Sequence, residues 1–303
     1  MIVFVAPGQG SQTPGFLEPW IADPATRDLV ASWSESIDVD LIAHGTVSDA
    51  DTIRDTAIAQ PLIVAAGLLT ARALRAAGVE IGAVAGHSVG EITAAAVAGV
   101  LSEADALAFV RARALAMADA AAAVPTGMSA VLGGDQNAVV EHVTALGLES
   151  ANYNGGGQIV VAGALDALAK LTEEPLRGTR VVPLQVAGAF HTRFMQPARE
   201  VLRAKAAGFT PADPAITLWT NKDGSVVTSG AEFVELLVGQ VANPVRWDLD
   251  MEAFAAAGVT GLVEFAPAGA LVGLAKRGLK GVPAVAIKTP DDLAAAAELA
   301  GTA

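Results

Sequence analysis

The sequence predicts an α/β fold in which a small domain is inserted into a larger one. The chain has 303 residues, of which 52% are apolar, and this is enough material for one large domain with a smaller addition. A short strand, a tight turn and a helix follow one another across residues 82–98, a pattern typical of α/β proteins. Residues 126–186 alternate strands and helices in a different order, which indicates the second domain.

The larger domain is expected to have a short parallel sheet with helices between its strands. The apolar segment at residues 2–5 predicts the first strand, and a helical region follows to about residue 43. Pro61 is expected in the first turn of a helix, where its missing N–H is tolerated. The remaining expected elements are strands at 82–85, 215–220 and 261–265, and helices at 58–77, 91–98, 103–119, 193–206 and 231–241.

The smaller domain has the β-α-β-β-α-β order of the ferredoxin-like motif. Asp135 is a suitable N-cap for its first helix. This assigns residues 126–186 to the small domain, and residues 1–125 and 187–303 to the larger one. Its expected elements are strands at 128–132, 151–153, 158–162 and 180–186, and helices at 135–145 and 165–171.

Composition excludes several classes of protein. The net charge is −13, whereas a protein that binds nucleic acid or an anionic membrane surface normally carries a basic face. The absence of cysteine removes disulfides, thiolate metal sites and a cysteine nucleophile, and it fits a reducing compartment such as the cytoplasm. No uninterrupted apolar run approaches the roughly 20 residues of a membrane span. The opening segment has the pattern of a buried strand and not that of a signal peptide.

The segment Gly86-x-Ser88-x-Gly90 matches a nucleophile elbow. A serine at the apex of such a turn has a strained backbone, and only glycines at these two positions let the strand and helix approach closely. The start of the following helix directs N–H donors toward the serine, where an oxyanion would form. The expected strand–turn–helix context favours this interpretation over a plain tight turn, and it indicates an α/β-hydrolase-like larger domain.

A nucleophilic serine needs a base, and the chain offers four histidines. His44 lies in an expected loop, and His142 is expected on the solvent side of a helix. His87 adjoins Ser88 in sequence, so its side chain diverges from that of the serine. His191 follows the last strand of the small domain, at the seam between domains where clefts form, and we favour it as the base.

A hydrolase triad would also need a carboxylate that comes after the serine and before the histidine in the sequence. No Asp or Glu between residues 91 and 190 stands at a strand end where it could serve. A backbone or amide carbonyl would then orient the imidazole. The resulting dyad suits group transfer better than hydrolysis.

Arg113 is unusual because it lies on an apolar helix face. A buried guanidinium needs an anionic partner, since burying it unpaired costs much free energy. One interpretation is an internal salt bridge; the other is a bidentate clamp for a substrate carboxylate, which would make the substrate a dicarboxylic thioester. At 100° per residue, the residues that share its face are Ala106, Phe109, Val110 and Met117.

Taken together, these motifs resemble the malonyl-CoA:acyl carrier protein transacylase family, which includes the acyltransferase domains of polyketide synthases. The resemblance covers nearly the whole chain. The matching segments are Pro7-Gly8-Gln9-Gly10-Ser11-Gln12, Gln60-Pro61, Gly86-His87-Ser88-Val89-Gly90-Glu91, Arg113 with Met117, Asn152-x-Asn154-Gly155, Ala189-Phe190-His191, Asn221-x-Asp223-Gly224, Gln240-x-x-Asn243-Pro244-Val245 and Gly273-Leu274-x-Lys276-Arg277.

The resemblance implies roles for individual positions. Ser88 would carry the acyl group, and His191 would act as base and then as acid toward the departing thiol. Arg113 would bind the malonyl carboxylate. The backbone N–H groups of Gln9 and Val89 would form the oxyanion hole.

Further roles follow from the same resemblance. Gln240 would orient the catalytic imidazole through its main-chain carbonyl. Asn152 and Asn154 would line the pocket or, alternatively, stabilise a hairpin turn. Lys276 and Arg277 would either favour the phosphates of a carrier or coenzyme or form a solvated helix end.

The resemblance also implies an acyl preference and a set of partners. Ala-Phe-His before the base looks like the malonyl-selective form, since the Phe190 ring would leave no room for the methyl of a methylmalonyl group. One methyl in a tight pocket is worth about 1–3 kcal/mol. The implied partners are malonyl-CoA and an acyl carrier protein of fatty acid or polyketide synthesis, with no metal and no cofactor, because the coenzyme A thioester is a substrate.

Three alternatives remain at this point. A serine esterase or thioesterase would share the elbow but would have no use for Arg113. A relative with another preference, such as methylmalonyl, would depend on the residue at Phe190. A non-catalytic module that only binds a carrier would tolerate Ser88→Ala.

Overall fold

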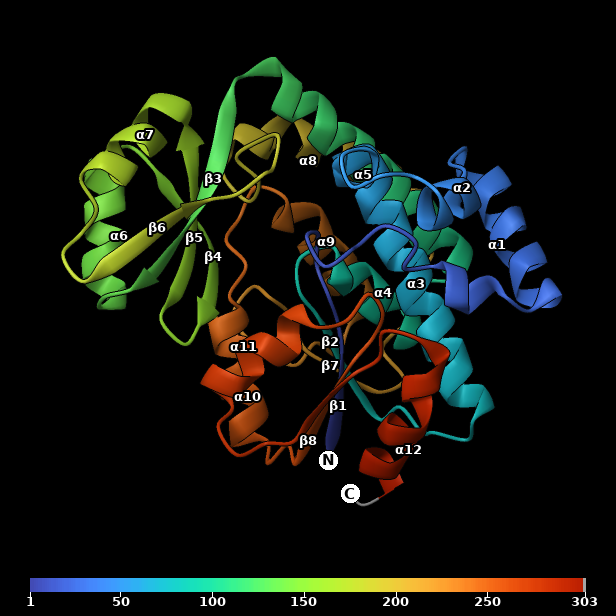
Figure 1. Cartoon of the computed structure of the whole chain (residues 1–303). Coiled ribbons are helices and arrows are strands. Elements are labelled where there is room, and N and C mark those ends of the chain that lie inside the picture. The colour runs from blue at the N-terminus through green and yellow to red at the C-terminus, as the bar shows by residue number, and fades with distance from the viewer. Residues whose placement is uncertain (302–303) are drawn as a thin grey trace.

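The computed structural model describes residues 1–301 and contains a five-stranded parallel sheet beside a four-stranded antiparallel one (Figure 1). The parallel sheet has the strand order β7-β2-β1-β8-β9, with the N-terminal strand at its centre. Its strands are β1 (Ile2–Ala6), β2 (Ala83–Gly86), β7 (Thr217–Leu218), β8 (Gly261–Glu264) and β9 (Ala284–Ala286).

Helices cover both faces of the parallel sheet, because its central strand is apolar on both sides. In β1, Phe4 packs into one hydrophobic cluster, and Val3 and Val5 pack into another. The first cluster includes residues of α3, α4 and α5, and the second includes residues of α10 and α11. The helices are α1 (Pro24–Ile37), α2 (Leu41–Thr46), α3 (Thr56–Ala76), α4 (Gly90–Val97), α5 (Glu103–Ala123), α8 (Gln196–Ala206), α9 (Gly230–Gln240), α10 (Trp247–Ala256), α11 (Ala270–Gly278) and α12 (Leu293–Gly301), with short 3-10 turns at Glu18–Ile21, Thr52–Arg54, Arg193–Met195 and Pro290–Asp292.

The antiparallel sheet carries its two helices on its outer face (Figure 1). Its strand order, β4-β5-β3-β6, is that of the ferredoxin-like motif. Alternate residues explain the two buried faces: Val131 and Ile159 pack under the helices, whereas Ala130 and Val160 join the core of the larger part. The elements are β3 (Thr126–Gly133), α6 (Gln136–Ala145), β4 (Glu149–Gly155), β5 (Gln158–Ala164), α7 (Leu165–Glu173) and β6 (Thr179–Pro183).

A backbone connection fixes the small sheet against the rest of the protein. Val245 donates to the carbonyl of Ala151 at 2.9 Å, and its own carbonyl accepts from the N–H of Tyr153 at 2.9 Å. Strand β4 is therefore held beside the chain that follows α9. This connection positions the two asparagines of β4 at the edge of the candidate site.

The α/β fold class with its inserted ferredoxin-like sheet is confirmed. The domain bounds of 126–186, and of 1–125 with 187–303, stay a prediction, and residues 302–303 lie outside the described part. Several details were wrong. Helix α3 begins at Thr56, so Pro61 lies inside the helix and not in its first turn. Because proline has no N–H, it cannot donate the helical hydrogen bond to the carbonyl of Ala57. That carbonyl instead accepts a hydrogen bond from Arg111 at 3.4 Å.

Other corrections concern short elements. His44 lies in α2 rather than in a loop, and its Nδ1 is 3.0 Å from the Ser48 hydroxyl. Helix α10, strand β9 and helix α12 were not expected from the sequence. Among residues 1–301, α3 is the one helix long and apolar enough to cross a membrane, and most of it is buried in the core.

Candidate active site

Ser88 lies at the apex of the turn between β2 and α4, with a backbone φ of +54°. The two flanking glycines are required sterically. A Cβ on Gly86 would lie 2.0 Å from the carbonyl carbon of Gly90, and a Cβ on Gly90 would lie 2.1 Å from the carbonyl oxygen of Ala6. The strand and the helix are thus too close for any side chain at either position.

His191 faces Ser88, and its ring is held from the opposite side. Its Nε2 lies 2.7 Å from Ser88 Oγ, and its Nδ1 lies 2.9 Å from the main-chain oxygen of Gln240. Because a carbonyl can only accept, Nδ1 carries the proton and Nε2 is the acceptor that faces the serine hydroxyl. The ring is therefore held in the tautomer that can remove the Ser88 proton.

The environment of His191 keeps its imidazole neutral. Burial, followed by the positive charge of Arg113, lowers the pKa of His191 to about 3. The ring is therefore in its basic form at neutral pH, as a general base must be.

Arg113 is 1% exposed and reaches the same serine. Its guanidinium donates to Ser88 Oγ at 3.2 Å, to Gln60 Oε1 at 2.7 Å and to Gln240 Oε1 at 2.8 Å. Burial lowers the pKa of Arg113 to about 9, so the group remains charged at neutral pH. Within residues 1–301 it forms no direct ion pair, so the internal salt bridge considered from the sequence is absent there.

Behind Ser88 lies a polar network that the local sequence patterns do not predict. Asn221 accepts from the N–H of Ser88 at 2.7 Å and donates to the carbonyl of Gly86 and to Asp250, both at 2.7 Å. Glu91 accepts from the N–H of Asn221 at 2.7 Å and from the side chain of Gln240. A signal for both residues was available, since Glu91 and Asn221 belong to segments that carry the resemblance, but nothing local indicates their partners.

A cavity of about 390 Å³ opens in front of Ser88, between the two sheets. It brings together every site residue expected from the sequence except Gln240, which lies behind the serine. Phe190 is buried in its wall beside His191. The expected residues that line it are Gln9, Ser88, Val89, Arg113, Asn152, Asn154, Phe190 and His191.

Asn154 also supports the turn. Its side-chain oxygen lies 2.9 Å from Nε2 of His87, and its amide nitrogen donates to Gln158 at 3.3 Å. Burial lowers the pKa of His87, so this second histidine is also neutral. His87 thus connects the serine turn to the small sheet through Asn154. Lys276 and Arg277 lie exposed in the last turn of α11, outside the cavity lining.

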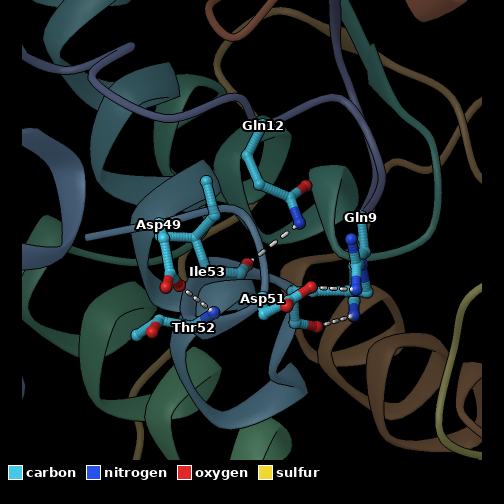
Figure 2. Close-up of polar contacts among 7 residues, drawn as sticks. Gln9, Gln12, Asp49, Asp51, Thr52 and Ile53 are labelled. Atoms are coloured by element: carbon cyan, nitrogen blue, oxygen red, sulfur yellow. Dashed lines mark hydrogen bonds and ion pairs between the residues drawn. The ribbon is translucent and has the colours of Figure 1, made fainter.

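Figure 2 shows how the loop that carries Gln9 is anchored. The Gln9 side chain donates to the carbonyl of Arg54 at 3.3 Å, and Gln12 donates to the carbonyl of Ile53 at 3.1 Å. These bonds hold the loop after β1 against the segment before α3. Among residues 1–301, the backbone N–H groups of Gln9 and Val89 donate no hydrogen bond, so both are available to a ligand in the cavity.

The acyl transferase domain family matches residues 3–302 of the chain. The malonyl CoA-acyl carrier protein transacylase of Mycobacterium tuberculosis is 52% identical over 297 residues, which cover 97% of this chain and 98% of that protein. The transacylase of the same name from Escherichia coli K12 is 33% identical over 307 residues, covering 98% of each.

Solved structures give the same result. The crystal structure of MCAT from Mycobacterium tuberculosis has a TM-score of 0.94 at 52% identity and covers 99% of both chains. A malonyl-transacylase solved in complex with a type II PKS acyl-carrier protein has a TM-score of 0.92 at 29% identity, covering 98% of this chain and 99% of that one.

Proposed function

The chain belongs to the malonyl CoA-acyl carrier protein transacylase family, and from this premise we propose that it moves a malonyl group from coenzyme A to the phosphopantetheine thiol of an acyl carrier protein. The carrier serves fatty acid or polyketide synthesis. One observation carries the proposal: Ser88 Oγ lies 2.7 Å from a neutral imidazole and 3.2 Å from a buried guanidinium. A base activates the serine, and a cation beside it suits an acyl group that ends in a carboxylate.

In the first half-reaction, Ser88 Oγ attacks the thioester carbon of malonyl-CoA while His191 Nε2 accepts the hydroxyl proton. The oxyanion that forms is stabilised by the free N–H groups of Gln9 and Val89. The carbon–sulfur bond then breaks, His191 returns its proton to the coenzyme A sulfur, and malonyl-Ser88 remains.

In the second half-reaction, the carrier thiol gives its proton to His191 and attacks the ester. The ester bond breaks, and Ser88 Oγ recovers the proton from the imidazole. Gln240 orients the imidazole throughout, through its main-chain oxygen. Because two thioesters of similar energy exchange through one ester, this sequence of steps needs neither a metal nor a cofactor.

The pocket explains the choice of acyl group in this proposal. Arg113 binds the malonyl carboxylate, and the Phe190 ring occupies the space that a methyl at C2 would need. Asn152 and Asn154 complete the wall from the small sheet. A cytoplasmic location is part of the proposal, since the chain carries no cysteine and its long apolar helix α3 is used in the core.

The test is the intact mass of the protein after brief exposure to malonyl-CoA, methylmalonyl-CoA or acetyl-CoA, with Ser88→Ala as the control. We expect a malonyl adduct that requires Ser88 and exceeds the other two. Release of free coenzyme A without an adduct would instead identify a thioesterase. Neither an adduct nor released coenzyme A would show that the substrate is wrong.

A further inference from the structure

Gln240 makes contacts with four different groups around the serine. Its main-chain oxygen accepts from His191, and its side-chain oxygen accepts from Arg113. Its amide nitrogen donates to the carbonyl of Ser88 at 3.0 Å and to Glu91. The Gln240 side chain thus lies between a buried guanidinium and a buried carboxylate.

Glu91 occupies this buried position without any cation in direct contact among residues 1–301. It is the second residue of α4 and is 1% exposed. One carboxylate oxygen accepts from the backbone N–H of Asn221 and the other from Gln240. Its electrostatic interaction with Arg113 is favourable for both charges and acts across the Gln240 amide.

The direction of the Gln240 amide decides whether Arg113 has an acceptor. A glutamine side chain has one oxygen that accepts and one nitrogen that donates. If the amide were reversed, its NH2 group would face the donors of Arg113, and its oxygen would face the Glu91 carboxylate. A carboxylate at position 91 excludes that arrangement, because it can only accept when ionised.

We propose that Glu91 is a positioning residue for Arg113: its carboxylate fixes the direction of the Gln240 amide and supplies the counter-charge that holds the guanidinium facing Ser88. The proposal rests on the function proposed above, in which Arg113 binds the substrate carboxylate. Glu91 itself touches no substrate, because it lies behind the serine turn and outside the lining of the front cavity.

Burial of Glu91 is costly, which supports a functional reason for its presence. Burial is the largest effect on this group and raises its pKa to about 7, although the hydrogen bonds from Asn221, Thr220 and Gln240 and the charge of Arg113 all favour the ionised form. An apolar or neutral residue would be easier to accommodate at this position. The carboxylate contributes a charge beside Arg113 that a neutral side chain could not.

Glu91→Gln is a sharp test because it keeps the shape and removes the charge. The carboxylate accepts at both oxygens, whereas an amide accepts at one; a glutamine at this position therefore cannot satisfy both Asn221 and Gln240. At pH 8, above the Glu91 pKa of about 7, we expect kcat/KM for malonyl-CoA to fall about 10- to 100-fold, the loss expected for a hydrogen bond to a charged group. The exposed Glu141→Gln change, on α6, is the matched control and should leave this value unaltered.

A second substrate separates positioning from general damage to the site. Acylation of Ser88 by p-nitrophenyl acetate, an uncharged ester, needs the serine and the histidine but not Arg113. We expect Glu91→Gln to lower this rate less than about threefold, because Ser88 and His191 keep their contact. In an Arg113→Ala background, Glu91→Gln should cause no further loss with malonyl-CoA, since the residue it positions is gone.

An equal loss with both substrates would overturn the proposal and assign Glu91 a structural role in the serine turn. An unchanged kcat/KM for malonyl-CoA would overturn it as well. Thermal unfolding of each variant identifies one that has lost its fold. Failure of the proposed function is distinguishable, because the wild-type protein would then form no malonyl-Ser88 at all.

Discussion

Ser88 and His191 both adopt left-handed backbone conformations, with φ of +54° and +63°, and their side chains meet at 2.7 Å. Such conformations cost a residue with a Cβ about 1–2 kcal/mol, and the surrounding fold must maintain them. For Ser88 the closely packed turn between Gly86 and Gly90 does so. For His191 the backbone bond to the carbonyl of Val241, 3.0 Å long, contributes. These backbone conformations direct Ser88 Oγ and His191 Nε2 toward each other.

The strain at Ser88 predicts that Ser88→Gly is more stable than Ser88→Ala. Both changes remove the same side-chain hydrogen bonds, but only glycine adopts this φ without a steric penalty. After allowance for the greater freedom of glycine in the unfolded chain, we expect a difference of about 1 kcal/mol in the free energy of unfolding. Urea denaturation of the two variants measures it. Equal stability would show that the turn is not strained.

The low pKa of His191 predicts an unusual pH dependence of Ser88 acylation. With a pKa of about 3, the imidazole stays neutral between pH 8 and pH 5. Acylation by p-nitrophenyl acetate should therefore change by less than about twofold over this range, whereas a base with an ordinary histidine pKa would lose about 30-fold. Stopped-flow release of p-nitrophenol measures it. A fall centred near pH 6.5 would contradict the buried, neutral imidazole.

Glu91→Gln is predicted to make the stability of the protein less sensitive to alkaline pH. The folded-state pKa of about 7 lies above the ordinary value of 4.5, so the folded protein binds more protons than the unfolded chain between these values. Stability from this group is thus fully present below pH 4.5 and is lost as pH rises through 7. The variant avoids that loss, which is on the order of 3 kcal/mol.

The measurement is the unfolding temperature of the wild type and of Glu91→Gln at pH 8 and pH 5. We expect the unfolding temperature of the variant to fall less between pH 5 and pH 8 than that of the wild type, because the hydrogen bond that the variant loses costs the same at both pH values. The titration of Asp250 adds to the effect, because the charge of Glu91 raises the pKa of Asp250 and the variant removes that charge. An equal fall in the two proteins would contradict the raised pKa of Glu91.

Arg113→Ala is predicted to slow the reaction with a charged substrate much more than the reaction with an uncharged one. A substrate carboxylate left without its cation should cost about 100-fold or more in kcat/KM for malonyl-CoA. Acylation by p-nitrophenyl acetate should be affected much less, since that ester has no carboxylate. Comparable losses with both substrates would indicate that Arg113 acts mainly on the Ser88 oxygen, 3.2 Å away.

Phe190→Ser is predicted to relax the acyl preference. Removing the ring from the cavity wall leaves room for a methyl at C2 of the acyl group, which is worth about 1–3 kcal/mol in discrimination. The ratio of malonyl to methylmalonyl adduct on Ser88, measured by intact mass under competition, should fall by about 10-fold or more. An unchanged ratio would place the selectivity elsewhere in the pocket.

Much of the fold was predictable because it rests on local patterns. The β-α-β-β-α-β order of elements in 126–186 indicated the small antiparallel sheet, whose two faces are both buried. Short elements late in the chain were not predicted. Strand β9 has only three residues, and it exists because it pairs with β8 along the edge of the sheet, a long-range contact with little local signal.

The sequence by itself determined the serine turn, because its constraint is local: glycines two residues before and after Ser88 are required by the close approach of β2 and α4. It also indicated His191 and Arg113 by their unusual placement. Only the tertiary structure decided how these groups are held. Gln240 forms hydrogen bonds with Glu91, Arg113 and Ser88, which lie 127 to 152 residues away in the sequence. A polar side chain has no periodicity that reveals its partner, so only the folded arrangement of α4, α5 and α9 determines which donor faces which acceptor.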